Sequence, residues 1–115
     1  MKVKRIVANI QTADIESAEK FYGAILGLNV LMDLGWIKTY GTETKMVTQI
    51  SFANEGGSGT LVPDLSIEVD DVDTAYTQMK ETEFPIEYGP VDEPWGVRRF
   101  FVRDPFGRLI NILSH

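Results

Sequence analysis

Histidine and cysteine, the side chains that carry much of the metal and nucleophilic chemistry of proteins, are nearly missing from this sequence. The 115 residues include no cysteine and a single histidine, His115, at the very end. One histidine cannot supply a two-histidine, one-carboxylate iron site or a histidine-based catalytic zinc site within one chain. We expect His115 to be frayed, which leaves the serines without a base for a Ser-His-Asp triad. Disulfides and thiol catalysis are excluded as well.

Carboxylates are the remaining candidates for acid–base chemistry. A catalytic carboxylate needs a raised pKa in a dry groove, and strand alternation makes Asp64 and Glu68 the two candidates for such a position. Either could instead form a structural ion pair with Arg99, which is the interpretation we favour. The acidic run at 70–73 lacks the glycine and the final glutamate of an EF-hand loop, so we assign it to the start of a helix.

Composition limits the kinds of partner that the protein can have. A hydrophobic content of 43% and a net charge of −6 describe a globular, acidic domain. Nucleic acid rewards a basic surface, so we expect no nucleic-acid partner, whereas a cationic ligand is compatible with the charge. No apolar run approaches the roughly 18 residues of a membrane span, and the N-terminus lacks a signal-peptide pattern. These features predict a cytoplasmic protein without a membrane partner.

Hydrophobic periodicity divides the first half of the chain into one strand, one helix and three further strands. A helix is expected from the N-cap Asp14 to the terminating glycine Gly27. The predicted strands are 3–10, 29–33, 36–40 and 45–53, with a turn at Gly41-Thr42-Glu43. The glycine-rich segment 54–62 follows as a flexible linker.

The second half repeats this order of elements. Asp71 caps the predicted helix, and the predicted strands are 65–69, 85–88, 98–103 and 109–113. A shift of 57 positions places Asp14 on Asp71 and Ile10 on Ile67. We therefore predict a single domain, 1–115, built from module one (about 1–53), the linker 54–62 and module two (about 63–115).

Side-chain alternation within the strands separates a helix-facing set from a set that faces a groove. The apolar sets, such as Ile6, Ala8 and Ile10, are expected to pack on the helices. Opposite them we place Val7, Asn9, Gln49, Ser66, Glu68, Arg99, Phe101 and Asn111. The aromatic candidates for the groove are Trp36, Tyr40, Trp95 and Phe101, although any single aromatic residue belongs to a core more often than it contacts a ligand. Trp95 lies in a predicted loop, 90–96, of the kind that often binds ligands.

Several short motifs resemble those of the vicinal oxygen chelate superfamily, the group of glyoxalases, extradiol dioxygenases and bleomycin resistance proteins. They are Asp14 with Phe21-Tyr22 and Leu26-Gly27-Leu28, Glu68-Val69-Asp70, and the turn Asp104-Pro105-Phe106-Gly107. Pro94-Trp95-Gly96 is most similar to the bleomycin-resistance branch. The resemblance implies an α+β fold in which two tandem βαβββ modules form a curved mixed sheet around a groove. It also implies a homodimer, because grooves in the family are often completed across two chains.

The resemblance further locates the positions at which superfamily enzymes hold a divalent ion. Carried over one by one, these positions are Val7, Gln49, Asp64 and Asn111. Valine has no donor atom, and neutral amides are weak ligands for catalytic divalent ions. We therefore expect no metal, no cofactor and no catalytic residue, as in the metal-free bleomycin-resistance branch.

Three functional hypotheses follow. The favoured one is a metal-independent protein that binds and sequesters an amphipathic or cationic drug-like molecule, as in antibiotic resistance. Its ligand-binding residues would be Trp36, Tyr40, Gln49, Glu68, Trp95, Arg99, Phe101 and Asn111. The alternative is a lyase or dioxygenase-like enzyme whose atypical metal site uses Asp64, Gln49 and Asn111. The third is a protein with no small ligand, whose groove is filled by its own side chains.

Overall fold

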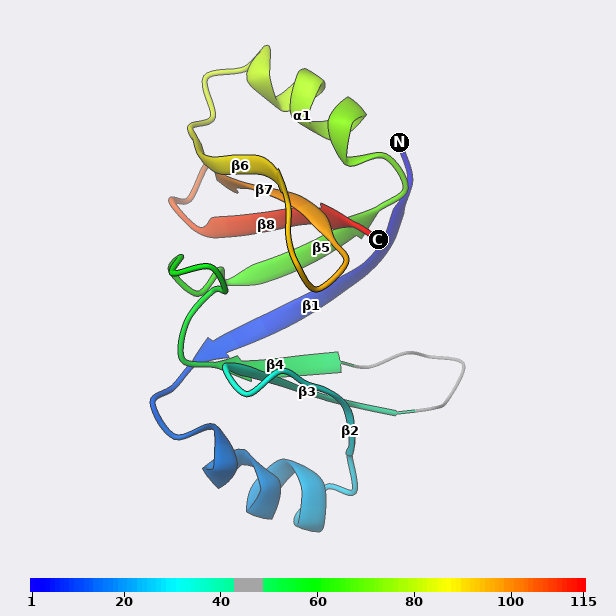
Figure 1. Ribbon diagram of the computed structural model, residues 1–115, viewed down its shortest axis with the longest axis vertical. Coiled ribbons are helices and arrows are strands. Elements are labelled where there is room, and N and C mark those ends of the chain that lie inside the picture. Colours follow the sequence, from blue (N-terminus) through cyan, green and yellow to red (C-terminus); the bar gives the residue numbers. More distant parts are fainter. Residues whose placement is uncertain (43–48) are drawn as a thin grey trace. The chain divides into compact units, whose positions relative to one another are not determined.

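A computed structural model describes residues 1–42 and 49–115, which form two compact units. The N-terminal unit comprises residues 7–62, and the C-terminal unit comprises residues 1–6 with 63–115. The first half contains β1 (Val3–Gln11), the 3-10 turn η1 (Ile15–Ser17), the π-helix η2 (Glu19–Ile25), β2 (Asn29–Asp33), β3 (Ile37–Gly41) and β4 (Gln49–Ala53). The second half contains β5 (Leu65–Val69), α1 (Val72–Lys80), β6 (Ile86–Asp92), β7 (Arg98–Arg103) and β8 (Leu109–Ser114). The predicted α+β class, with one βαβββ order repeated, is confirmed (Figure 1).

Strands in the N-terminal unit follow the order β2-β3-β4-β1. β1 runs parallel to β4, with Ala8 opposite Ile50, and the other neighbouring pairs are antiparallel. Tyr40 of β3 also lies opposite Ile50, so both side chains project to the same face. The helical segments cover this face through a buried cluster that consists of Ile15, Ala18, Tyr40 and Phe52. The predicted strand 45–53 is observed from Gln49 onward; its first part, 45–48, and the turn residue Glu43 lie outside the described residues.

The first helix differs from the prediction of one continuous helix. The side chain of Asp14 makes no capping hydrogen bond to a backbone N–H and instead accepts a hydrogen bond from the hydroxyl of Ser17. The segment therefore begins as a 3-10 turn and continues as a π-helix. The end agrees with the prediction, because Gly27 has a left-handed φ of 75°.

The packing predicted for β1 is wrong at its apolar residues. Ala8 and Ile10 do share the face of Ile50 and Phe52, but Ile10 is 41% exposed and Ile6 is 57% exposed. Val7, which alternation placed on the groove side, is buried. Alternation correctly separates the two faces of a strand, but it does not say which face is covered.

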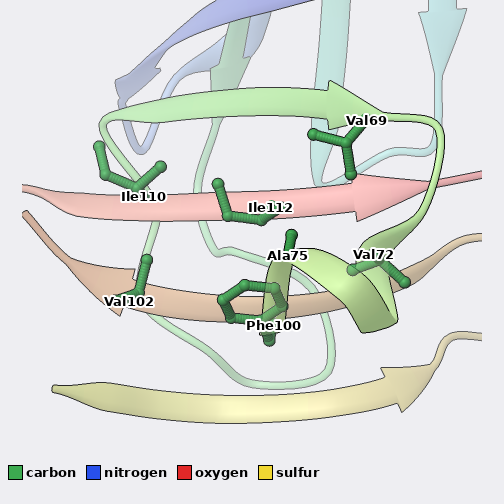
Figure 2. Packing of buried hydrophobic residues seen from close by; sticks show 7 residues of the cluster. All are labelled: Val69, Val72, Ala75, Phe100, Val102, Ile110 and Ile112. Carbon is green, nitrogen blue, oxygen red and sulfur yellow. The ribbon is translucent and has the colours of Figure 1, made fainter. Parts of the chain in front are cut away.

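The C-terminal unit has the strand order β5-β8-β7-β6, with a parallel β5–β8 pair and antiparallel β8–β7 and β7–β6 pairs. Helix α1 covers one face of this sheet. Figure 2 shows the side chains that meet there: Val69, Val72, Ala75, Phe100, Val102, Ile110 and Ile112. Val69 of β5 and Ile110 and Ile112 of β8 are residues that alternation assigned to the helix side; Phe100 and Val102 come from β7, and Val72 and Ala75 come from α1.

The start of α1 agrees with the prediction, whereas the length of β6 does not. Asp71 caps α1 as predicted, because its carboxylate accepts hydrogen bonds from the backbone N–H and the hydroxyl of Thr74, at 3.1 and 2.7 Å. Strand β6 is longer than predicted, since it extends through Pro90 to Asp92 and shortens the expected loop. β6 is an edge strand, where proline is tolerated.

Candidate functional site

The sheet face opposite α1 in the C-terminal unit carries the polar and aromatic side chains of the candidate site. Strand register places Asn111 directly beside Ser66 on one side and Phe101 on the other. The neighbouring row contains Glu68, Leu113 and Arg99. Four residues of the predicted ligand-binding set therefore share one face: Glu68, Arg99, Phe101 and Asn111.

A buried ion pair lies on this face, between Arg99 of β7 and Glu93 of the turn that follows β6. Arg99 Nη2 donates to Glu93 Oε2 at 2.7 Å, and the two side chains are only 4% and 3% exposed. Glu93 also accepts a hydrogen bond from the Tyr88 hydroxyl at 3.0 Å. Removing both charges from water is costly, so the pair depends on this close geometry and on the added hydrogen bond. The sequence analysis did not identify Glu93 or Tyr88. A signal for Glu93 was available, because it is an acidic residue that follows one predicted strand and precedes an arginine-rich one.

Aromatic rings surround the Arg99 guanidinium. Its central carbon lies 4.8 Å from the ring centroid of Phe101, 5.0 Å from that of Trp95 and 5.5 Å from that of Tyr88. Each distance is within the range of a cation–π interaction. Trp95, Arg99 and Phe101 were all predicted to bind ligand, and the structure brings them together. We call Glu93 and the three rings the Arg99 cage.

The turn between β6 and β7 places Trp95 against Arg99. Gly96 N donates to Glu93 O at 3.1 Å, and Glu93 N donates to Val97 O at 2.7 Å. Proline is favoured at the second position of such a turn, where Pro94 lies. Gly96 closes it with a left-handed φ of 92°. The Pro-Trp-Gly motif therefore has a structural role, which is to close the turn that carries Trp95.

Asn111 has an unused hydrogen-bonding atom on this face. Its Nδ2 donates to Ser66 Oγ at 3.1 Å, and only 7% of the residue is exposed. Its Oδ1 is buried and has no hydrogen-bond partner among residues 1–42 and 49–115. A buried polar atom without a partner is costly, so it favours a bound water or a ligand group with a donor.

The predicted pairing of Glu68 or Asp64 with Arg99 is wrong. Glu68 instead accepts from Arg5 Nε at 2.5 Å, because the start of β1 belongs to the same unit as β5. The imidazole Nε2 of His115 lies 3.4 Å from Arg5 Nη2 and 4.0 Å from Glu68 Oε1, so the terminal residue contacts this pair.

The superfamily's metal-ligand positions carry an unsuitable donor set. Val7 has no donor atom, and the Asn111 amide is bonded to Ser66. Asp64 Oδ2 accepts from the backbone N–H of Leu109 at 3.0 Å, which fixes the beginning of β8 beside β5. Gln49 lies in the N-terminal unit. Within the described parts of the chain, no group of three or more His, Cys, Asp or Glu side chains is placed to hold a metal ion.

The aromatic prediction fails for Tyr40. This residue is completely buried in the helix-facing core of the N-terminal unit, and its hydroxyl donates to Glu19 Oε2 at 3.1 Å. Burial, followed by the hydrogen bond to Glu19, raises the pKa of Tyr40 to about 12. Trp36 precedes β3 and is half-buried, and its carbonyl accepts from Asn54 N. The opposite face of this sheet, where Tyr40 was expected, contains a buried hydrogen bond of 2.7 Å between the hydroxyls of Thr39 and Ser51.

Comparison with known proteins identifies the family. The model of the Glyoxalase/Bleomycin resistance protein/Dioxygenase superfamily matches residues 2–112, and the chain belongs to this superfamily. No protein with a curated description matches the chain. No helix within residues 1–42 and 49–115 is long and apolar enough to cross a membrane.

Solved structures share the fold at low sequence identity. A Legionella pneumophila protein described as an NAD-dependent benzaldehyde dehydrogenase is 17% identical, with a TM-score of 0.74 and coverage of 96% of this chain and 98% of the other. A superfamily member from Vibrio splendidus 12B01 is 18% identical, with a TM-score of 0.65 and coverage of 99% and 100%. The methylmalonyl-CoA epimerase of Streptomyces coelicolor is 15% identical, with a TM-score of 0.64 and coverage of 98% and 96%. These likenesses support the fold and carry no activity to this chain.

Proposed function

We propose that this chain is a small-molecule binding protein of the glyoxalase and bleomycin-resistance type that holds an amphipathic, drug-like ligand without a metal ion. The observation that carries the proposal is the sheet face opposite α1, where Phe101 lies beside Asn111, whose Oδ1 is buried without a partner among the described residues, and Trp95 contacts Arg99 in the neighbouring row. Aromatic side chains combined with a few placed polar groups are the usual design of a small-ligand site.

The donor chemistry favours binding over metal catalysis. Among the four superfamily positions, Val7 offers no ligand atom, and Asp64 accepts a hydrogen bond from the backbone of β8. A protein of this kind could protect a cell by sequestering an antibiotic. We further propose a cytoplasmic homodimer; light scattering of the purified protein measures the mass directly, and a monomer at micromolar concentration would contradict this part.

Tryptophan fluorescence tests the proposal. The Trp36→Phe variant leaves Trp95 as the single reporter, and Trp95→Phe is its matched control. Titration with a panel of neutral and cationic drug-like molecules is expected to give a saturable change for the first variant and a much smaller one for the second. Asn111→Leu should weaken binding about fivefold, because one hydrogen bond contributes roughly 1 kcal/mol. No saturable response from any compound would reject the binding function.

Elemental analysis separates the proposal from the alternative, an enzyme of the same superfamily with an atypical metal site that involves Asp64, Gln49 and Asn111. The proposal predicts no stoichiometric transition metal in protein purified without chelator. A bound metal at one equivalent per chain, together with turnover that stops on chelation, would replace the binding function with the enzymatic one.

A further inference from the structure

The Arg99 cage has the composition of a site for an organic cation. The centroids of three aromatic rings lie 4.8–5.5 Å from the guanidinium carbon of Arg99. Glu93 supplies a carboxylate whose Oε2 lies 2.7 Å from Arg99 Nη2. Proteins recognise quaternary ammonium and related cations with similar aromatic surroundings. In this chain, however, the occupant of the cage is a side chain of the protein itself.

We propose that Arg99 is an internal cation that determines specificity: by occupying the cage, it excludes cationic ligands and leaves the face selective for uncharged amphipathic molecules. This inference rests on the proposed binding function and narrows its ligand class. A ligand cation beside Arg99 would meet a like charge at short range in a desolvated environment. The carboxylate of Glu93 is already paired with Arg99, so it is not available as a counterion for the ligand. The net charge of −6 favours approach of cations, so the exclusion has to be local.

Arg98 provides an internal comparison, because it neighbours Arg99 on β7 but points to the opposite face. Arg98 pairs with Asp73 at 3.1 Å and with Asp92 at 3.3 Å, and its side chain is 36% exposed. The two arginines share the strand and the charge but differ in burial and in ring contacts. Removing Arg98 therefore controls for the loss of one positive charge from β7.

Chemical rescue tests whether the cage recognises a cation. Arg99→Ala is expected to have a lowered Tm, because Glu93 loses its partner. Guanidinium chloride or methylguanidinium chloride at millimolar concentration should raise that Tm by several degrees in a saturable manner, since a ligand that binds only the folded state stabilises it. Sodium chloride at equal ionic strength should not, and wild type and Arg98→Ala should show no rise with either guanidinium salt. The absence of a selective rise in Arg99→Ala would overturn the proposal.

Further variants test the ring contacts and the charge of residue 99 separately. In Arg99→Ala/Trp95→Leu, the guanidinium-dependent rise should fall by more than half; an undiminished rise would show that the rings do not recognise the cation. If Arg99→Ala does not fold, Arg99→Lys is compared with Arg99→Gln, which is similar in length but neutral. The lysine variant should have the higher Tm, and a Tm equal to or below that of the glutamine variant would overturn the proposal.

Selectivity is then read from binding. A fluorescence titration with an aromatic quaternary ammonium compound should give saturable binding to Arg99→Ala, and at least tenfold weaker binding to wild type; equal affinities would overturn the exclusion. These experiments use simple cations rather than a natural ligand. A failed guanidinium rescue would therefore overturn the cage proposal but not the binding function. A panel in which no compound binds would reject the binding function but would not affect a successful rescue.

Discussion

The buried pair of Glu93 and Arg99 should couple far more strongly than the exposed pair of Asp73 and Arg98 on the same strand. The Nη2–Oε2 distance is 2.7 Å, with side chains 4% and 3% exposed, against 3.1 Å with 36% and 65% exposure for the second pair. Breaking a buried pair by removing one partner costs about 3–5 kcal/mol, whereas exposed pairs contribute about 0.2–1 kcal/mol. At roughly 4 °C per kcal/mol for a domain of this size, Glu93→Gln should lower Tm by about 12–20 °C.

A double-mutant cycle isolates the coupling from the other effects of each substitution. Glu93→Gln keeps an acceptor for the Tyr88 hydroxyl, so the main loss is charge. Adding Arg99→Met to Glu93→Gln removes the remaining buried charge. The double variant should therefore be more stable than the sum of the two single losses of stability predicts. Urea unfolding followed by circular dichroism gives the four free energies, and the Asp73–Arg98 cycle is the control.

Salt concentration provides an independent check on the same cycle. Screening by salt weakens exposed pairs more than buried ones, so the coupling of Asp73 with Arg98 should decline between low and high salt while that of Glu93 with Arg99 persists. If both cycles give less than about 1 kcal/mol, Arg99 is not buried against Glu93, and the reasoning about the cage is refuted.

Three other predictions concern backbone space, pH and packing. Gly89→Ala should abolish stable folding of the C-terminal unit, since the new Cβ would lie 2.5 Å from the carbonyl oxygen of Arg99, whereas Gly107→Ala, with nothing within 4 Å, should cost only the roughly 1–2 kcal/mol of a left-handed residue; similar Tm values for the two would contradict this. Because the pKa of Tyr40 is raised to about 12 in the folded state, its contribution to stability is complete below pH 10 and declines as pH rises through 12, by up to about 1.4 kcal/mol per pH unit; Tyr40→Phe should remove this part of the pH dependence in urea titrations, and an unchanged slope would argue against the buried phenol. Phe100→Ala should cost about 3–5 kcal/mol because the ring is fully buried, while Phe106→Ala, at a site 86% exposed, should leave Tm nearly unchanged, so equal losses would contradict the described core.

The sequence predicted best what depends on short-range periodicity. Alternation assigned Ile110 and Ile112 to the side of α1 and Asn111 to the other, and the core cluster confirms this for the two isoleucines. The N-cap at Asp71 and the left-handed Gly27 were also predicted, because each depends on a few adjacent residues. Such features are local, so one sequence carries enough information to find them.

The sequence failed where the outcome depends on contacts between distant segments. Glu68 pairs with Arg5, 63 positions away, and no periodicity within a strand reveals such a partner. Tyr40 was one of the aromatic candidates for the groove. Its hydroxyl reaches Glu19 from the core, and a buried tyrosine is stable when its polar end finds such a partner. The pairing of Glu93 with Arg99 likewise depends on the turn that returns the chain from β6 to β7.

Arg98 and Arg99 show how much of the functional argument depends on strand parity. The same side chain occurs at two successive positions, and it is solvent-accessible and paired with surface carboxylates at one but buried among aromatic rings at the next. A register slip of one residue would exchange these environments and would place Phe100 in the cage and Phe101 under α1. The two phenylalanines are themselves alternated to match, since Phe100 fills the core that α1 covers and Phe101 stacks on the guanidinium. The Arg-Arg-Phe-Phe order therefore fixes β7 in a single register, and that register gives Arg99 its place in the cage.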